Sequence, residues 1–247
     1  MAPELLLLSS SRIHGGGYLE YARETLLDFL GGRRTVHFAP FAVADEAGYT
    51  AQVGRSLAEY GLEVVGLDGL RDSAVGEAVE SAEVLFVGGG NSFRLLKRLQ
   101  ELGLLEHVRR RVLAGELRYM GSSAGSNMAC PSLRTTNDMP IVQPASFSAF
   151  GLVPFQINPH YVDAPSGSTH MGETREQRIA EFLQHNDVAV LGLREGAWLR
   201  RRGGVLTLGG VMGGRVFRRG VVPEEIAPGA DVSWLLEAEP RFDVPES

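Results

Sequence analysis

The sequence predicts an α/β protein with a mostly parallel central sheet, and three observations lead to that prediction. Short runs rich in leucine, valine and phenylalanine alternate with amphipathic segments through the first half of the chain. These runs are nearly continuous in apolar residues, which is typical of parallel strands buried on both faces. Glycine-rich and serine-rich turns follow several of them, at the edge where parallel sheets usually carry their functional residues.

The elements of this sheet follow one another through residues 4–123. We expect strands over 4–10, 35–42, 62–68, 83–90 and 117–123. We expect helices over 17–32, up to Gly61, around 73–81, over 91–103 and from there to about Ala114. Glycines after the first two helices fit the usual stop signal of a helix.

The pattern changes after residue 130. Residues 130–150 are rich in turn formers and predict a long loop, and 151–162 predict a strand that breaks at Pro159. A loop over 163–173 leads to a helix over 174–186, and residues 187–210 predict a strand and a hairpin. No internal repeat or linker is visible, which favours a single domain over residues 1–247.

Composition argues against several classes of protein. A formal net charge of −6 and a pI near 5.6 argue against nucleic acid as the main partner. No apolar stretch approaches the roughly 18 residues that a membrane span needs, and the apolar start lacks the basic region of a signal peptide. The single cysteine, Cys130, excludes an intramolecular disulfide and fits a reducing compartment. We therefore expect a cytoplasmic protein.

The stretch "GSSAGSN" at residues 121–127 fits the pattern G-x-S-x-G. That pattern is typical of a sharp turn between strand and helix that exposes a nucleophilic serine. Among its three serines, Ser123 has a glycine two places away on either side, so the register selects Ser123. The alternative is a glycine-rich turn whose serines cap the next helix. The pattern alone does not choose between the two.

The stretch "GGGN" at residues 88–91 ends another predicted strand. It fits neither GxGxxG nor a P-loop, so a nucleotide site is weakly supported. A phosphate cradle, an oxyanion hole and a simple tight turn remain open. Beside a serine elbow, an oxyanion hole made by the amides of Gly90 and Ala124 becomes attractive. Asn91 is a good cap for the following helix.

An activated serine needs a general base, normally histidine, and usually an acid that orients it. The chain has six histidines: His14, His37, His107, His160, His170 and His185. Position favours His160, which lies at the end of an apolar strand, while His14 and His170 lie in loops that could approach a site. Asp138 and Glu195 are candidate acids. No compact cluster of metal ligands is visible, so no metal is expected.

Several stretches together resemble the peptidase E family of bacterial α-aspartyl dipeptidases. They are "ELLLLS", "VGGGNSFRLLK", "GSSAGSNMACPSLRTTNDMPIV", "LVPFQINPHY", "GETREQRI" and "VLGLREGAW". The resemblance implies a cytoplasmic serine exopeptidase that hydrolyses Asp-Xaa dipeptides through an acyl-enzyme, with no cofactor. It also implies a three-layer α/β sandwich related to class I glutamine amidotransferase domains.

The same resemblance assigns roles to individual residues. It implies Ser123 as nucleophile, His160 as base, and Gly90 and Ala124 as the oxyanion hole. The acid stays open between Asp138, slightly preferred, and Glu195. We expect Asn91 and Arg175 to bind substrate, because an arginine matches the geometry of an aspartate side chain. A surface role for Arg175 at its helix start is nearly as well supported.

The chain departs from the family's pattern at Ser122, where tryptophan is expected, and at Ser126, where alanine is expected. The first change predicts a reshaped pocket. Two other functions remain as alternatives: a cyanophycinase-like hydrolase of β-aspartyl linkages, and a non-catalytic domain that binds a small molecule. We expect a small peptide as partner, neither nucleic acid nor membrane, and a monomer or homodimer.

Overall fold

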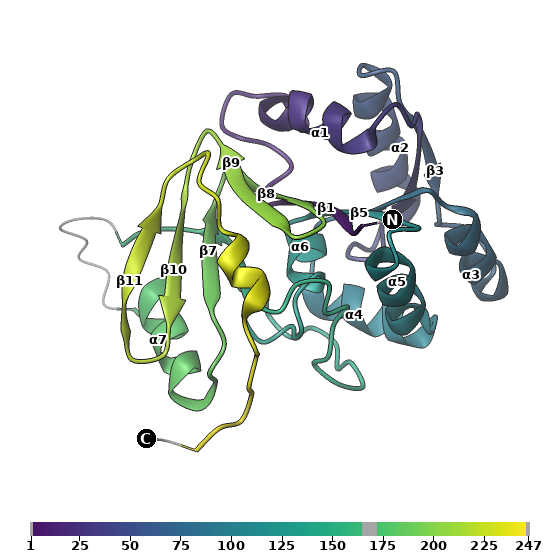
Figure 1. Ribbon diagram of the computed structural model, residues 1–247. Coiled ribbons are helices and arrows are strands. Elements are labelled where there is room, and N and C mark those ends of the chain that lie inside the picture. Colours follow the sequence, from purple (N-terminus) through teal and green to yellow (C-terminus); the bar gives the residue numbers. More distant parts are fainter. Residues whose placement is uncertain (1, 165–171, 246–247) are drawn as a thin grey trace.

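The computed structural model describes residues 2–164 and 172–245. Its larger sheet has seven strands in the order β3-β2-β4-β5-β1-β8-β9 (Figure 1). Their bounds are Glu4–Leu8 for β1, Thr35–Ala39 for β2, Glu63–Gly66 for β3, Val84–Val87 for β4, Arg118–Ser122 for β5, Ala197–Arg202 for β8 and Val205–Gly210 for β9. Strands β1 to β5 pair in parallel, and β8 and β9 join antiparallel. The predicted mostly parallel sheet is confirmed.

Helices cover both faces of this sheet. Successive side chains of each strand point to opposite faces, so apolar strands present apolar surface on both. Leu6 and Leu8 of β1 pack with α1 (Arg23–Leu30) and α2 (Glu46–Ala58). Leu5 and Leu7 pack on the opposite face with four helices. These are α3 (Asp72–Ser81), α4 (Ser92–Glu101), α5 (Leu104–Leu113) and α6 (Ala124–Met128). The result is the expected three-layer α/β sandwich.

A second sheet of four strands, in the order β11-β10-β7-β6, was not predicted. Its strands are β6 (Gln156–Tyr161), β7 (Val190–Arg194), β10 (Gly214–Arg218) and β11 (Val221–Ile226), and α7 (Arg175–His185) packs against it through a small apolar cluster. Figure 1 shows this sheet and α7 beside the main sandwich. Strands β7 and β8 follow each other in the chain but belong to different sheets, so the turn between them crosses from one sheet to the other.

The predicted break at Pro159 is wrong, because β6 continues to Tyr161. Strand β6 lies at the edge of its sheet, where a residue without an N–H group can be tolerated. Its pairing with β7 shifts register between Pro159 and Tyr161, which leaves His160 at an irregularity of the strand. Such bulges re-aim a side chain, and here the residue concerned is a candidate catalytic base.

The long loop predicted over 130–150 is confirmed. It carries one isolated bridge, between Ser132 and Ser148, and its Met139 carbonyl accepts from Asn91, which follows β4. Among the residues that the structure describes, no helix has the length and apolar character needed to cross a membrane.

Candidate active site

Ser123 lies at a sharp turn between β5 and α6. Its φ of 53° and ψ of −112° are strained for a residue with a side chain, and such strain is typical of a nucleophile elbow. The flanking glycines have a steric reason. A Cβ at Gly121 would lie 2.5 Å from the backbone of Gly125, and a Cβ at Gly125 would lie 2.0 Å from the carbonyl oxygen of Val87.

The Ser123 side chain faces the site rather than the helix that follows it. Among residues 121–130 it alone is not buried, and it makes no capping hydrogen bond to α6. Its Oγ lies 2.8 Å from Nε2 of His160. The helix-capping alternative for this serine therefore does not describe the structure.

His160 is held from both its backbone and its ring. Its φ of 53° is that of a bulged residue, and its N–H donates to the Oγ of Ser9 at 2.9 Å. The Ser9 hydroxyl in turn donates to the carbonyl of Leu193 at 2.7 Å. On the ring, Nδ1 lies 2.7 Å from Oε1 of Glu195. A Ser–His–Glu relay thus joins the elbow to the turn between β7 and β8.

The slight preference for Asp138 as the acid beside His160 is corrected by this geometry. One oxygen of the Asp138 carboxylate, Oδ2, accepts from the backbone N–H of Ser92 at 2.7 Å and from its hydroxyl at 2.6 Å. The Asp138 carboxylate is therefore engaged at the amino end of α4. The carboxylate hydrogen-bonded to the imidazole is that of Glu195, whose side chain is 57% exposed.

The two predicted oxyanion amides belong to Ala124, the residue after Ser123, and to Gly90 in the glycine loop after β4. A Cβ placed at Gly89 would lie 3.1 Å from the Cβ of Ser123, so the glycine loop after β4 touches the elbow. In that loop the amides of Gly88, Gly89 and Asn91 donate to acceptors of the protein. The N–H groups of Gly90 and Ala124 donate to no backbone carbonyl among the described residues.

Asn91 has a different role from the substrate contact that was expected. Its side-chain oxygen accepts from the N–H groups of Phe93 and Arg94, and its Nδ2 donates to the carbonyl of Met139 at 2.9 Å. Both ends of the amide are used within the protein. Asn91 caps α4 and fastens the long loop.

Arg175 lies in a pocket of about 200 Å³ that Asp138, Asn158 and Arg178 also line. Burial, and secondly the charge of Arg178, lower the pKa of Arg175, while the charge of Asp138 opposes this shift. Within the described residues the guanidinium of Arg175 has no ion pair, whereas Arg178 pairs with Glu173. The pocket therefore offers a cation in a partly dehydrated position, which suits an anionic group of a ligand.

Comparisons with known proteins identify the family of this chain. The model of peptidase family S51 matches residues 5–209. The chain belongs to peptidase family S51. It is 55% identical to peptidase E of Streptomyces coelicolor over 239 residues, covering 97% of each chain. It is 48% identical to a protein of Drosophila melanogaster named probable alpha-aspartyl dipeptidase, covering 96% of this chain and 98% of that one.

A solved structure supports the fold of this S51 member. The crystal structure of a peptidase from an acI-B1 actinobacterium superposes with a TM-score of 0.66 at 17% identity. The superposition covers 94% of this chain and 97% of that chain.

The two departures from the family's pattern have different surroundings. Ser126 belongs to α6, and its hydroxyl bonds to the carbonyls of Leu8 and Gly121. Ser122 is 1% exposed, and its hydroxyl has no hydrogen-bond partner in the described part of the chain. The side chain of Ser122 therefore lies inside the protein rather than on an open pocket wall, and nothing in the structure explains why a serine stands there.

The other four histidines that the structure describes belong to other segments of the chain. His37 is in β2, and His107 pairs with Glu80 on the surface of α5. His14 is exposed in a loop, and His185 ends α7. His170 lies outside the described residues, as does most of the loop predicted over 163–173.

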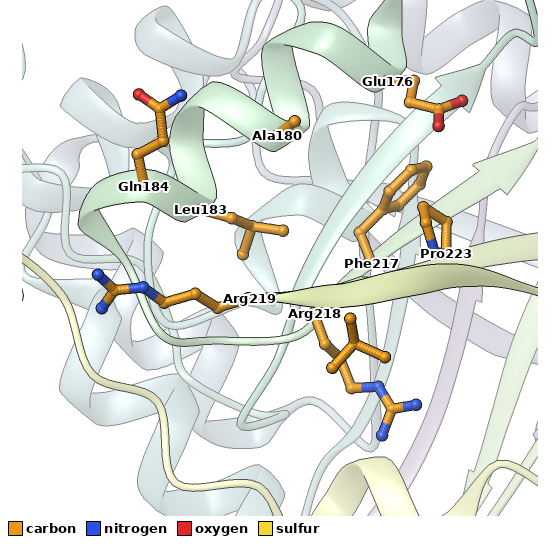
Figure 2. Close-up of a pocket in the computed structure, with 10 residues that line it drawn as sticks. Glu176, Ala180, Leu183, Gln184, Phe217, Arg218, Arg219 and Pro223 are labelled. Atoms are coloured by element: carbon orange, nitrogen blue, oxygen red, sulfur yellow. The ribbon is translucent and has the colours of Figure 1, made fainter. Parts of the chain in front are cut away.

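A further pocket of the described structure is not at the relay. It has a volume of about 650 Å³ and lies between α7 and the strands β10 and β11. Figure 2 shows Leu183 and Phe217 near its centre and Glu176 at one end. Its lining includes none of the residues of the relay, and Glu176 is already bonded to Arg215 at 3.0 Å.

Sequence reasoning missed several residues that hold this site together. They are Ser9, Tyr49, Ser92, Thr136 and Asn137. Four of them belong to stretches quoted above: Ser9 ends "ELLLLS", Ser92 lies in "VGGGNSFRLLK", and Thr136 and Asn137 lie in "GSSAGSNMACPSLRTTNDMPIV". These stretches were noticed in the sequence, but roles were assigned to their glycines and to Asp138 and not to these hydroxyl and amide side chains.

Proposed function

We propose that this chain is a serine dipeptidase that hydrolyses Asp-Xaa dipeptides through an acyl-enzyme on Ser123. The observation that carries the proposal is the relay itself, with Ser123 Oγ at 2.8 Å from His160 and His160 at 2.7 Å from Glu195. Family S51 and the relatives named peptidase E and probable alpha-aspartyl dipeptidase support both the reaction and the substrate class.

In this mechanism His160 takes the Ser123 proton on Nε2 while Oγ attacks the scissile carbonyl carbon. The Nδ1–H of His160 donates to Glu195, which holds the ring in the required tautomer and stabilises the imidazolium. The oxyanion receives hydrogen bonds from the amides of Gly90 and Ala124. His160 then protonates the departing amine, the C–N bond breaks, and water hydrolyses the ester on Ser123.

The pocket that Arg175 lines supports the substrate class, and Asn158, two residues before His160 in β6, lines the same pocket. A dipeptide that begins with aspartate carries a carboxylate close to its scissile carbonyl. The guanidinium of Arg175, without an ion pair among the described residues, is the proposed partner of that carboxylate. Dipeptides without an acidic first residue would leave the partly buried guanidinium of Arg175 unpaired, which disfavours their binding.

The decisive experiment compares Asp-Leu, Glu-Leu, Leu-Asp and β-aspartyl-Leu as substrates of the wild type and of Ser123→Ala. We expect hydrolysis of Asp-Leu to dominate, and a loss of at least about 10⁴-fold in kcat for Ser123→Ala. Cleavage of β-aspartyl-Leu without Asp-Leu would favour the cyanophycinase-like alternative. Turnover of none of the four would favour the non-catalytic one.

A cytoplasmic location is part of the proposal. The location is supported by the single cysteine, Cys130, which is free and buried. Proteins of oxidising compartments commonly carry paired cysteines that form disulfides, and this chain has no such pair. A small peptide as partner, a monomeric or dimeric state, and independence from metals and cofactors remain predictions.

A further inference from the structure

The segment 135–139 bonds to two parts of the active site: the amino end of α4, which follows the glycine loop, and strand β6, which carries His160. On one side Asp138 Oδ2 accepts from the N–H and the hydroxyl of Ser92, and the hydroxyl of Thr136 donates to the Ser92 hydroxyl at 3.0 Å. The Thr136 hydroxyl also accepts from the N–H of Asp138 at 3.2 Å. Ser92 is thus held by the carboxylate of Asp138 and by the hydroxyl of Thr136.

Ser92 lies two residues after Gly90, whose amide is a proposed oxyanion donor. The backbone of Gly90 has a φ of 134°, and a Cβ there would lie 2.5 Å from the carbonyl oxygen of Ala42. Between them, Asn91 donates its N–H to Ala42 and its Nδ2 to Met139, the residue after Asp138. The direction of the Gly90 amide therefore depends on how firmly the start of α4 is held.

The same segment reaches the strand that carries His160. The Nδ2 of Asn137 donates to the carbonyl of Pro159 at 2.7 Å. The Nδ2 of Asn158 donates to Oδ1 of Asn137 at 2.7 Å and to the carbonyl of Thr135 at 2.9 Å. Adjacent residues of one loop thus bond to α4 and to β6.

The carboxylate at 138 is well suited to this place. A helix amino end carries free N–H groups and a partial positive charge, so an anion there forms charge-assisted hydrogen bonds. Because Oδ2 takes both bonds from Ser92 and His160 is bonded to Glu195, the position of Asp138 favours neither a proton relay nor orientation of the imidazole.

We propose that Asp138 is a positioning residue that acts through Ser92. It fixes the amino end of α4, and with it the Gly90 amide, at the correct distance from His160, to whose strand, β6, Asn137 ties the same loop. The inference rests on the proposed function, since it assigns Gly90 to the oxyanion. It separates the roles of the two carboxylates: Glu195 acts on the base and Asp138 acts on the oxyanion site.

The test is a double-mutant cycle with Ser92→Ala, Asp138→Ala and the double variant, assayed with Asp-Leu. A misplaced donor affects the transition state more than the bound substrate. We expect each single variant to lose roughly 10- to 100-fold in kcat with KM changed less than about 3-fold. The double variant should be no worse than Asp138→Ala, because Asp138→Ala already removes both hydrogen bonds from Ser92 and Ser92→Ala removes one of these two. Losses that multiply, or a rise in KM seen with Asp138→Ala but not with Ser92→Ala, would overturn the proposal in favour of direct contact between Asp138 and substrate.

Two further variants keep the outcome interpretable. Asp138→Asn retains an oxygen that can accept from Ser92, so it should keep more activity than Asp138→Ala; equal losses would point to a need for charge and against positioning. Ser148→Ala is the matched control, since Ser148 is exposed in the same long loop. Thermal melting of every variant shows whether it is folded.

A probe without an aspartyl group separates this proposal from the proposed function. The rate at which an alkyl fluorophosphonate modifies Ser123 depends on the base and the oxyanion site, not on recognition of a dipeptide. It should fall in Ser92→Ala and Asp138→Ala by a similar factor, even if Asp-Leu proves not to be a substrate. An unchanged rate in both folded variants would refute the positioning role.

The acidic limb of the kcat/KM–pH profile gives a second independent readout. A residue that acts on the oxyanion site should lower the whole profile without displacing this limb. A residue that orients His160 should displace it. We expect no displacement in Asp138→Ala and a displacement in Glu195→Gln; the reverse pattern would return Asp138 to the relay.

Discussion

The seven-stranded and four-stranded sheets contribute to the active site in different ways. The larger sheet provides Ser123 and the proposed oxyanion donors, the amides of Gly90 and Ala124, from the carboxyl ends of β5 and β4, two adjacent parallel strands. The smaller sheet provides His160 from a bulged edge strand, and Glu195 comes from the turn that crosses between the sheets. The first half is fixed by close backbone packing, and the second half by a few side-chain hydrogen bonds.

Exposure follows the same division. The elbow is buried apart from Ser123 itself, whereas the side chains of His160 and Glu195 are 38% and 57% exposed. The buried turn has no room for a Cβ at either flanking glycine, so its backbone holds Ser123 in a single position. The base and its acid stand nearer to solvent, so their alignment depends on the particular bonds that hold them. Changes in the second half should therefore affect chemistry with little effect on folding.

Glu195→Gln should have the largest effect of the changes to the second half. The amide cannot stabilise the imidazolium as a carboxylate does, and it can hold the wrong tautomer. We expect kcat/KM on Asp-Leu to fall roughly 10³-fold, less than the ~10⁴-fold known for a buried triad acid because Glu195 is partly hydrated. Glu181→Gln, an exposed change on α7, is the control. If Glu195→Gln kept a third or more of wild-type activity, the two halves would not be joined through this residue.

Gly90→Ala tests the first half. The added Cβ would meet the carbonyl oxygen of Ala42 at 2.5 Å, and alanine is strained at a φ of 134°. The loop has to move, which displaces an oxyanion donor, so we expect a loss of roughly 10²-fold in kcat. The control is Gly76→Ala in α3, where a Cβ meets nothing within 4 Å. Activity close to wild type in a folded Gly90→Ala would exclude this amide from the oxyanion site.

The first half of the site was more predictable from sequence than the second for a physical reason. Ser123 could be selected because the elbow's requirement is local, glycine two places before and after it, and the structure explains both glycines by contacts under 3 Å. Gly90 and Ala124 were predicted as oxyanion donors because the ends of neighbouring parallel strands lie together, and that role stays a prediction. No pairing beyond the βαβ pattern was needed.

The choice between Asp138 and Glu195 could not be made in that way. Whether Glu195 reaches His160 depends on the parallel pairing of β6 with β7, across a bulge that sets Tyr161 opposite Arg194. Neither the second sheet nor the bulge has a sequence signal of its own. Asp138 belongs to a stretch that resembles the family's motif, yet its carboxylate accepts hydrogen bonds from Ser92.

Ser9→Ala examines the connection between the halves. Ser9 follows β1 of the larger sheet, is 0% exposed, and bonds to the backbone of both strands of the smaller sheet that flank the relay, at His160 and Leu193. Its loss leaves a buried acceptor and a donor without this partner, which costs about 1–3 kcal/mol. We expect the free energy of urea unfolding to fall by that amount and kcat to fall several-fold. Ser81→Ala, which removes an exposed local bond in α3, should leave both unchanged.

Cys130 reports on the boundary between the halves without altering it. Cys130 lies two residues after the end of α6, and its thiol sulfur accepts from the N–H of Ile157 in β6 at 3.1 Å. Burial raises the pKa of this thiol to about 12, so it stays protonated and unreactive at neutral pH. An aromatic disulfide reagent should therefore label no thiol in the native protein over minutes and one thiol per chain in denaturant. Because labelling requires α6 and β6 to separate, its slow native rate measures how often the two halves part. That rate should rise in Ser9→Ala, which loosens the boundary, and stay unchanged in Glu195→Gln, which alters only the relay; equal rates in Ser9→Ala and the wild type would show that Ser9 does not hold the halves together.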